Sequence, residues 1–291
     1  YNMAYSGYGL GQTLALLEEA LTLSPRLVIV GLYGGNDLID TFFMVHDEGK
    51  LPELTSSDPA IGEAIARARA TGPSLTEPWK ATQSAWRWGG AGALPRQIGA
   101  WLGESTRLGG VGRALIRAAN ERPGAPKPTL PWDEIRDRAD DAPDDLLFAV
   151  DVDGVRTVLT PKTRLSVLDL DDARVTEGLR LVVASLTRIS RHVPLLVVFI
   201  PTKELVVARA LDRAGVSQPP SMKALVGHET AMWASVGRQL TTAQIPWVDA
   251  LPALRARVTA GDFPYRMDHD GHPNDSGNEA LATLVAEAAS V

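Results

Sequence analysis

The chain has 291 residues, enough for one large α/β domain or for one domain that carries an insertion. Its apolar fraction of 45% is ordinary for a globular protein, and its formal charge of -6 disfavours a nucleic-acid partner, because no basic excess exists to neutralise phosphates. The absence of cysteine excludes disulfides, thiolate metal sites and cysteine nucleophiles. No apolar run of about 18 residues and no signal peptide is visible. The compartment stays open, with a periplasmic or secreted location favoured.

Helices and apolar strands alternate in two parts of the chain. Residues 10–23 have helical apolar spacing, and the run that begins at 27 reads as a buried strand. After residue 170 we expect a helix capped by Asp171 or Asp172 and reaching about 192, a strand at 195–200, helices at 203–214 and 222–243, a strand at 245–249 and a last helix at 275–289. Strands that are apolar on both faces and separated by helices predict a three-layer α/β/α fold with a parallel sheet.

Residues 45–165 break this pattern and hold five of the seven tryptophans. Asp58 and Pro59 are typical of a helix start, and 148–160 reads as a hairpin that turns at Asp153-Gly154. We interpret this region as a mostly helical insertion over the carboxyl edge of the sheet, and residues 1–44 and 166–291 as the α/β domain. Its tryptophans are candidates for stacking on sugar rings or, alternatively, for packing anchors.

Two glycine-containing turns each flank a predicted element. Ser6-Gly7-Tyr8-Gly9 precedes the first helix, where glycine lets a backbone N–H approach a ligand; a plain turn or a dinucleotide loop are the alternatives. Gly34-Gly35-Asn36-Asp37 follows the first strand, where open α/β sheets place their ligands. An Asn side chain there can donate to a developing oxyanion, although the same residues also favour an ordinary turn.

The segment Asp268-His269-Asp270-Gly271-His272 puts two carboxylates and two imidazoles in five residues, just before the last helix. An acid two places from a histidine can hold the imidazole in one tautomer and stabilise its charged form. The alternatives are a polar loop in which Asp275 or Ser276 caps the helix, and a metal site that lacks a clear third or fourth ligand. We therefore predict no metal and no organic cofactor.

Together these three segments resemble the SGNH (GDSL-like) hydrolase family, over residues 1–44 and roughly 165–291. The resemblance implies a flavodoxin-like sheet and a serine esterase or O-acyltransferase. It implies that Gly7 and Asn36 hold the oxyanion and that Asp270 orients His272 as the general base. Asp268 is the second candidate for the orienting acid, since the family's common spacing is Asp-x-x-His.

The resemblance lacks the family's Gly-Asp-Ser motif, which carries the nucleophile. The one Gly-Asp pair, Gly261-Asp262, is followed by Phe263. In a flavodoxin-like sheet of order 2-1-3-4-5 the first strand lies between the second and the third. We therefore expect the 291 residues to belong to a longer polypeptide whose N-terminal piece supplies that strand and the serine. Without it, the strand at 28–30 would have one free edge.

Two further residues are candidates for substrate contact. Lys203 follows the strand at 195–200, where its ammonium could meet an anionic or carbonyl group; the alternative is a helix capped by Thr202 with an exposed charge pair. Asp37, the last residue of the Gly34-Gly35-Asn36-Asp37 turn, is the second candidate. We expect a small-molecule or carbohydrate ester as substrate, with O-acetylated polysaccharide preferred, and no nucleic acid. The other function classes are a non-catalytic carbohydrate-binding or scaffold protein and a nucleotide-binding protein.

Overall fold

The computed structural model describes residue 3 and residues 9–88, 130–142 and 145–290. Three parallel strands form its main sheet in the order β1 (Val28–Tyr33), β4 (Leu195–Ile200) and β5 (Trp247–Asp249). Strand β1 pairs with β4 over its full length, from Val28 opposite Leu195 to Tyr33 opposite Ile200. Because the strands are parallel, their carboxyl ends lie at one edge, so the turns after β1 and β4 are neighbours. The α/β class with a parallel sheet is confirmed, although β5 is shorter than the predicted 245–249.

The larger hydrophobic core joins β1 and β4 to helices from both ends of the chain. Val30 and Leu32 of β1 belong to it, with Val197 and Phe199 of β4. The predicted first helix is interrupted at Leu16. The helices that contribute to this core include α1 (Leu10–Ala15), α2 (Leu17–Thr22), α3 (Asp37–His46), α10 (Ala173–Ser190) and α12 (Pro220–Thr242). No helix among the described residues has the length and apolarity needed to cross a bilayer.

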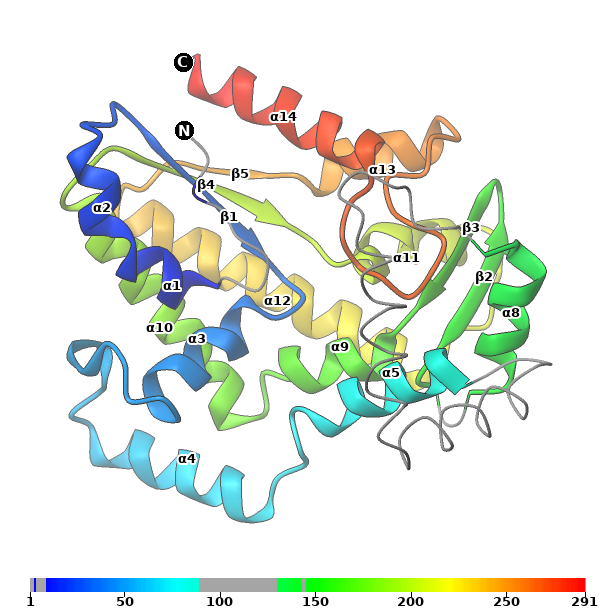
Figure 1. Cartoon of the computed structure of the whole chain (residues 1–291), viewed down its shortest axis with the longest axis horizontal. Helices are drawn as coiled ribbons and strands as arrows, with labels where there is room; N and C mark the ends of the chain where they lie inside the picture. Colours follow the sequence, from blue (N-terminus) through cyan, green and yellow to red (C-terminus); the bar gives the residue numbers. More distant parts are fainter. Residues whose placement is uncertain (1–2, 4–8, 89–129, 143–144, 291) are drawn as a thin grey trace, which may run out of the picture.

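A second core lies around the last helices and the hairpin. It joins α11 (Lys203–Arg213), α13 (Leu251–Thr259) and α14 (Asp275–Ala289) to β2 (Phe148–Val152) and β3 (Val155–Leu159). The segment between α13 and α14 touches β3, since Val158 donates its N–H to the carbonyl of Met267 at 2.9 Å. This contact places the predicted Asp-His loop between the parallel sheet and the hairpin, as Figure 1 shows.

The described residues between α3 and α10 form mainly helices. They include η1 (Pro52–Leu54), α4 (Pro59–Thr71), α5 (Glu77–Trp88), α8 (Trp132–Asp140), the hairpin and α9 (Pro161–Leu168). The predicted helix start is confirmed, because Asp58 accepts the N–H of Ala60 at 2.9 Å. The predicted hairpin is confirmed as well, with Asp153 and Gly154 at φ values of 49° and 80° in its turn. In Figure 1 these elements lie beside and below the parallel sheet.

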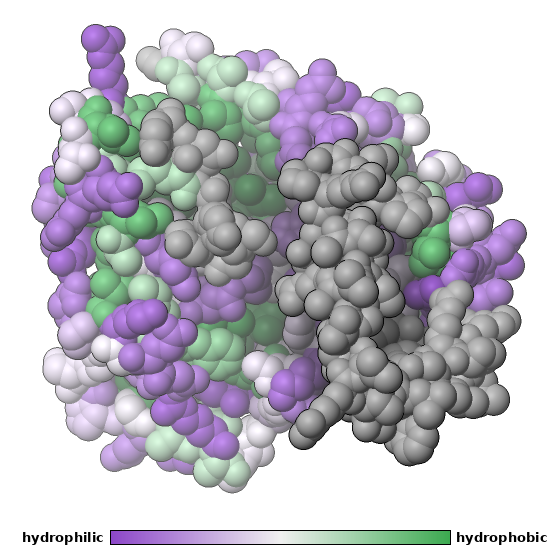
Figure 2. Space-filling view, viewed as in Figure 1, coloured by the Kyte–Doolittle hydropathy of each residue, from purple (hydrophilic) through white to green (hydrophobic). Residues whose placement is uncertain are grey.

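One edge of β1 carries no strand among the described residues, since β1 pairs with β4 alone. Ile29 is 47% exposed, although a strand of this composition usually buries such a side chain. The space-filling view shows apolar atoms at the bottom of a hollow in the region of β1 and β4 (Figure 2). The free edge agrees with the sequence expectation for this strand.

Candidate functional site

The Asp-His loop is anchored to the carboxyl ends of two neighbouring strands. At the end of β1, the Tyr33 hydroxyl donates to the carbonyl of Gly271 at 3.3 Å. Directly after β4, the carbonyl of Pro201 accepts the hydroxyl of Tyr265 at 3.1 Å, and Tyr265 forms a bridge with Pro273. The loop therefore lies at the edge of the sheet where the sequence placed the candidate site.

The last helix is capped by Asn274, not by Asp275 or Ser276 as the alternative interpretation of this loop suggested. The Asn274 side chain accepts the N–H of Gly277 at 3.0 Å. Its amide also donates to the carbonyl of Phe263 at 2.8 Å. One side chain thus starts α14 and ties both ends of the loop together.

Within the loop, Asp270 and His272 form a close pair. The Nδ1 atom of His272 lies 2.6 Å from Oδ1 of Asp270, and the same oxygen accepts the backbone N–H of His272 at 3.0 Å. These hydrogen bonds hold the pKa of Asp270 far below its usual range, and the first of them raises the pKa of His272. Asp268 instead pairs with Arg266 at 2.9 Å, so the carboxylate that orients the imidazole is that of Asp270.

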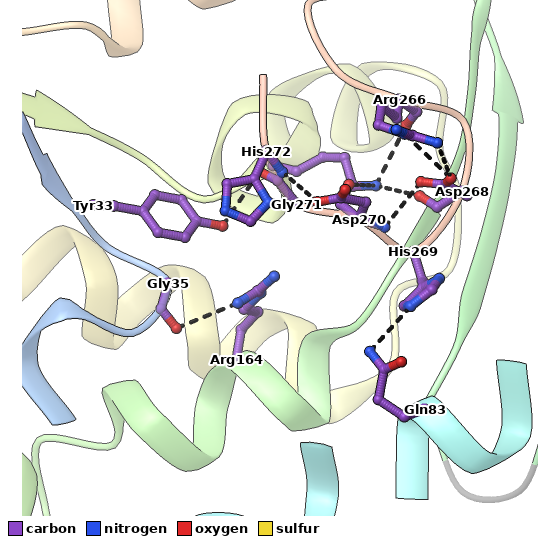
Figure 3. A network of polar contacts seen from close by, with 11 residues as sticks. Tyr33, Gly35, Gln83, Arg164, Arg266, Asp268, His269, Asp270, Gly271 and His272 are labelled. Carbon is purple, nitrogen blue, oxygen red and sulfur yellow. Dashed lines mark hydrogen bonds and ion pairs between the residues drawn. The ribbon is translucent and has the colours of Figure 1, made fainter. Parts of the chain in front are cut away.

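The His272 ring presents its other nitrogen outward. Its side chain is 76% exposed, and its ring centroid lies 5.9 Å from that of Tyr33. Because Asp270 occupies Nδ1, that nitrogen carries the proton in the neutral ring and Nε2 is left as the free base. His269 points elsewhere, toward Gln83 at 3.2 Å and the ring of Trp86, so the two imidazoles do not meet (Figure 3).

Lys203 binds the backbone of this loop. Its side chain is fully buried, and its ammonium donates to the carbonyls of Asp268 at 2.7 Å and Asp270 at 3.0 Å. Burial lowers the pKa of Lys203 to about 8. Thr202 caps α11 as predicted, with its hydroxyl 3.2 Å from the N–H of Leu205. The expected exposed charge pair is wrong, because Lys203 and Glu204 are both buried.

The turn after β1 places Asn36 at the start of α3. The Asn36 amide donates to the carboxylate of Asp40. Asp37 is buried and accepts the N–H of Tyr33 at 2.7 Å, so it closes the turn. Burial raises the pKa of Asp37 to about 7. A ligand that uses the Asn36 donor must therefore compete with Asp40.

Gly7 and Ser6 lie outside the described residues, whereas Gly9, the last residue of the same glycine-containing turn, is described. Gly9 begins α1, and a methyl group on Gly9 would lie 3.2 Å from Cβ of Asp40. The same Asp40 side chain holds the Asn36 amide. The first helix thus starts beside the strand-end turn.

Sequence reasoning missed Arg164, a buried residue of α9 that touches both motifs. Its Nη1 donates to the carbonyl of Gly35 at 3.4 Å, and a methyl group on Gly271 would lie 2.6 Å from its Nη2. The strand-end turn and the Asp-His loop therefore lie on the same side of the molecule, around one guanidinium (Figure 3). Nothing local in 161–168 marks an arginine as part of a site.

Glu229, in the middle of α12, was missed as well. It accepts the N–H of Thr202 at 2.8 Å and the indole N–H of Trp233 at 3.1 Å. A methyl group on Gly34 would lie 2.7 Å from its Oε1. Burial raises the pKa of Glu229 to about 7. This side chain joins the turns after β1 and β4 and so fixes the base of the candidate site.

No family model matches the chain, and no curated protein or solved structure matches it. The fold and the site are those of an α/β protein with a parallel sheet and a hydrogen-bonded Asp-His pair at the carboxyl edge of that sheet.

Proposed function

We propose that the protein acts in ester hydrolysis or acyl transfer, with His272 as general base and Asp270 as the residue that orients it. The observation that carries this proposal is the 2.6 Å contact between Nδ1 of His272 and the Asp270 carboxylate, with the rest of the ring exposed. An imidazole held in this way can remove a proton from a hydroxyl group through Nε2, and the adjacent carboxylate stabilises the imidazolium that results.

The reaction also needs donors for the oxyanion that forms at the acyl carbon. Asn36 is the side-chain candidate, and the backbone N–H of Gly7 is the second one that the family resemblance suggests. Asn36 starts a helix directly after β1, and the neighbouring Gly35 contacts the guanidinium that also touches Gly271. One preorganised donor of this kind contributes about 3 kcal/mol to catalysis.

No serine of the described residues makes a hydrogen bond with His272, so the nucleophile comes from elsewhere in this proposal. We propose that a serine is supplied by a segment that pairs with the free edge of β1. The order β1-β4-β5 would then be the last part of a three-layer, flavodoxin-like sheet. The free edge and the half-exposed Ile29 support this arrangement, because natural proteins seldom leave such edges open.

An O-acetylated carbohydrate is the substrate class that we favour. Trp79 is 47% exposed and offers a face to a sugar ring, whereas Trp86 packs against His269 and Arg138. A non-catalytic carbohydrate-binding or scaffold protein of the same fold is the second candidate. This second candidate is favoured by one observation: no hydroxyl group of a described residue makes a hydrogen bond with the His272 ring.

Hydrolysis of p-nitrophenyl acetate tests the proposal. His272→Ala should reduce turnover by several orders of magnitude, as expected when a general base is lost. His192→Ala is the matched control, because this histidine lies exposed in the turn before β4. Labelling of the intact protein with a fluorophosphonate, followed by mapping of the modified residue, identifies the serine. Equal turnover in all three proteins and no labelling would favour the scaffold candidate instead.

A further inference from the structure

The buried guanidinium of Arg164 has most of its hydrogen-bond donors unused. The residue is 7% exposed, yet the only hydrogen bond of its side chain to a described residue is the long one from Nη1 to the carbonyl of Gly35, at 3.4 Å. Its Nε is buried with no partner, and its Nη2 makes no hydrogen bond with a described residue. A guanidinium offers five N–H donors and stays charged, so a buried one without partners is costly.

The neighbouring acids do not neutralise Arg164 by direct pairing. Asp270 binds His272, Glu204 accepts the N–H of Thr160 at 2.7 Å, and Glu229 binds the turn after β4. Burial acts to lower the pKa of Arg164, but the attraction of nearby groups, these three acids among them, outweighs it. Arg164 forms no ion pair with any described residue. Its charged form is stabilised by acids at longer range, but most of its N–H donors stay unpaired.

The guanidinium and the His272 ring both lie against the ring of Tyr33. Arg164 sits 5.8 Å from the Tyr33 ring centroid, and that ring stacks against His272. Nη2 lies directly against the loop backbone, because a methyl group on Gly271 would come within 2.6 Å of Nη2 and 2.7 Å of the Tyr33 hydroxyl. Figure 3 shows the Arg164 guanidinium between Gly35 and the Asp-His loop.

We propose that Arg164 binds a carboxylate group next to His272, and that the ligand is a monocarboxylate such as the acid released by ester cleavage. The planar fork of a guanidinium matches the two oxygens of a carboxylate. The acids around the site disfavour a doubly charged anion such as sulfate. The ammonium of Lys203 is already bound to loop carbonyls and adds no free donor. The identity of the acid rests on the proposed function, whereas binding of a carboxylate does not.

Calorimetric titration of the whole protein with sodium acetate, at constant ionic strength, tests this assignment. Arg164→Met should weaken acetate binding by 10-fold or more, since a charge-assisted bidentate contact of this kind accounts for about that factor. Arg255→Met is the matched control, because Arg255 also has an unpartnered buried Nε and one carbonyl partner, Leu205 at 2.9 Å. It should bind acetate as the wild type does. Sulfate should bind more weakly than acetate.

Further variants separate the possible failures. If Arg164→Met does not fold, Arg164→Lys keeps the charge, removes the fork and should still weaken acetate binding. His272→Ala should lose esterase turnover and retain acetate binding. A wild-type protein that binds acetate but has no esterase turnover would contradict the proposed function alone. Absence of acetate binding in the wild type, equal affinity in the Arg164 variants, or tighter binding of sulfate would overturn the assignment of Arg164.

Discussion

Replacement of Lys203 by Met tests whether this residue positions the Asp-His loop or contacts a substrate. The ammonium donates to the loop carbonyls of Asp268 and Asp270, at 2.7 and 3.0 Å. Two hydrogen bonds from a charged donor contribute about 3–6 kcal/mol before desolvation is counted. Burial lowers the pKa of Lys203 from 10.5 to about 8, so the charged form costs about 3 kcal/mol of this gain. The net loss of stability in Lys203→Met should therefore be at most about 3 kcal/mol.

The substitution should also reduce turnover. The loop that loses its two hydrogen bonds carries Asp270 and His272, and a displacement of about 1 Å at a catalytic group can cost on the order of 100-fold in rate. We expect kcat for p-nitrophenyl acetate to fall with little change in KM. Lys223→Met, on an exposed face of α12, should change neither the unfolding free energy nor kcat.

The pH dependence of stability gives an independent check on Lys203. Because its folded-state pKa is lowered to about 8, the unfolded chain binds more protons between about pH 8 and 10.5. The stability of the wild type relative to Lys203→Met should therefore rise over that interval, as measured by urea unfolding. A raised KM with unchanged kcat and unchanged stability would show that Lys203 meets the substrate, and the positioning argument would be refuted.

Three other substitutions test separate parts of the site. Asp270→Asn should lower the pKa of His272, which the carboxylate now raises, so the rise of kcat/KM with pH should shift to lower pH while its plateau falls ~100-fold or more; an unshifted profile would contradict the pairing. Asn36→Ala should cost on the order of 100-fold in kcat with KM nearly constant, and an unchanged kcat would remove this residue from the oxyanion site. Gly271→Ala puts a methyl group 2.6 and 2.7 Å from two side chains and should destabilise the protein by about 1–3 kcal/mol in thermal unfolding. Its control, Gly227→Ala, meets no atom within 4 Å and should be neutral or slightly stabilising.

Local signals in the sequence were enough for the strands and for several helix starts. The apolar runs at 28–33 and 195–200 have no polar face, which is typical of strands in a parallel sheet, and both are strands. Asp58, Asp172 and Thr202 precede helices and each accepts a backbone N–H in the first turn. Such signals depend on neighbours a few residues away, so they can be read without knowledge of the fold.

The candidate site was predictable only where its residues are close in sequence. Asp270 and His272 are two residues apart, and their contact needs nothing from the rest of the chain. Arg164 reaches Gly35 across a separation of 129 residues, and Glu229 reaches Thr202 from the middle of a long helix. A polar residue inside a helix usually faces solvent, so neither pattern indicates a buried contact.

The two buried cations at this edge of the sheet differ in one property that decides their roles. Lys203 and Arg164 are both buried, and both have Glu204 and Asp270 among the acids around them. The ammonium of Lys203 has its donors directed at the carbonyls of its own loop, so its charge stabilises a conformation and is not available to a ligand. The Arg164 side chain has one long hydrogen bond to a described residue, so the desolvation cost of its burial is not offset by contacts within the fold. Lys203→Met should therefore lower the free energy of unfolding, whereas Arg164→Met should leave it unchanged or raise it. Urea unfolding of both variants measures this difference, and the opposite order would refute the reasoning.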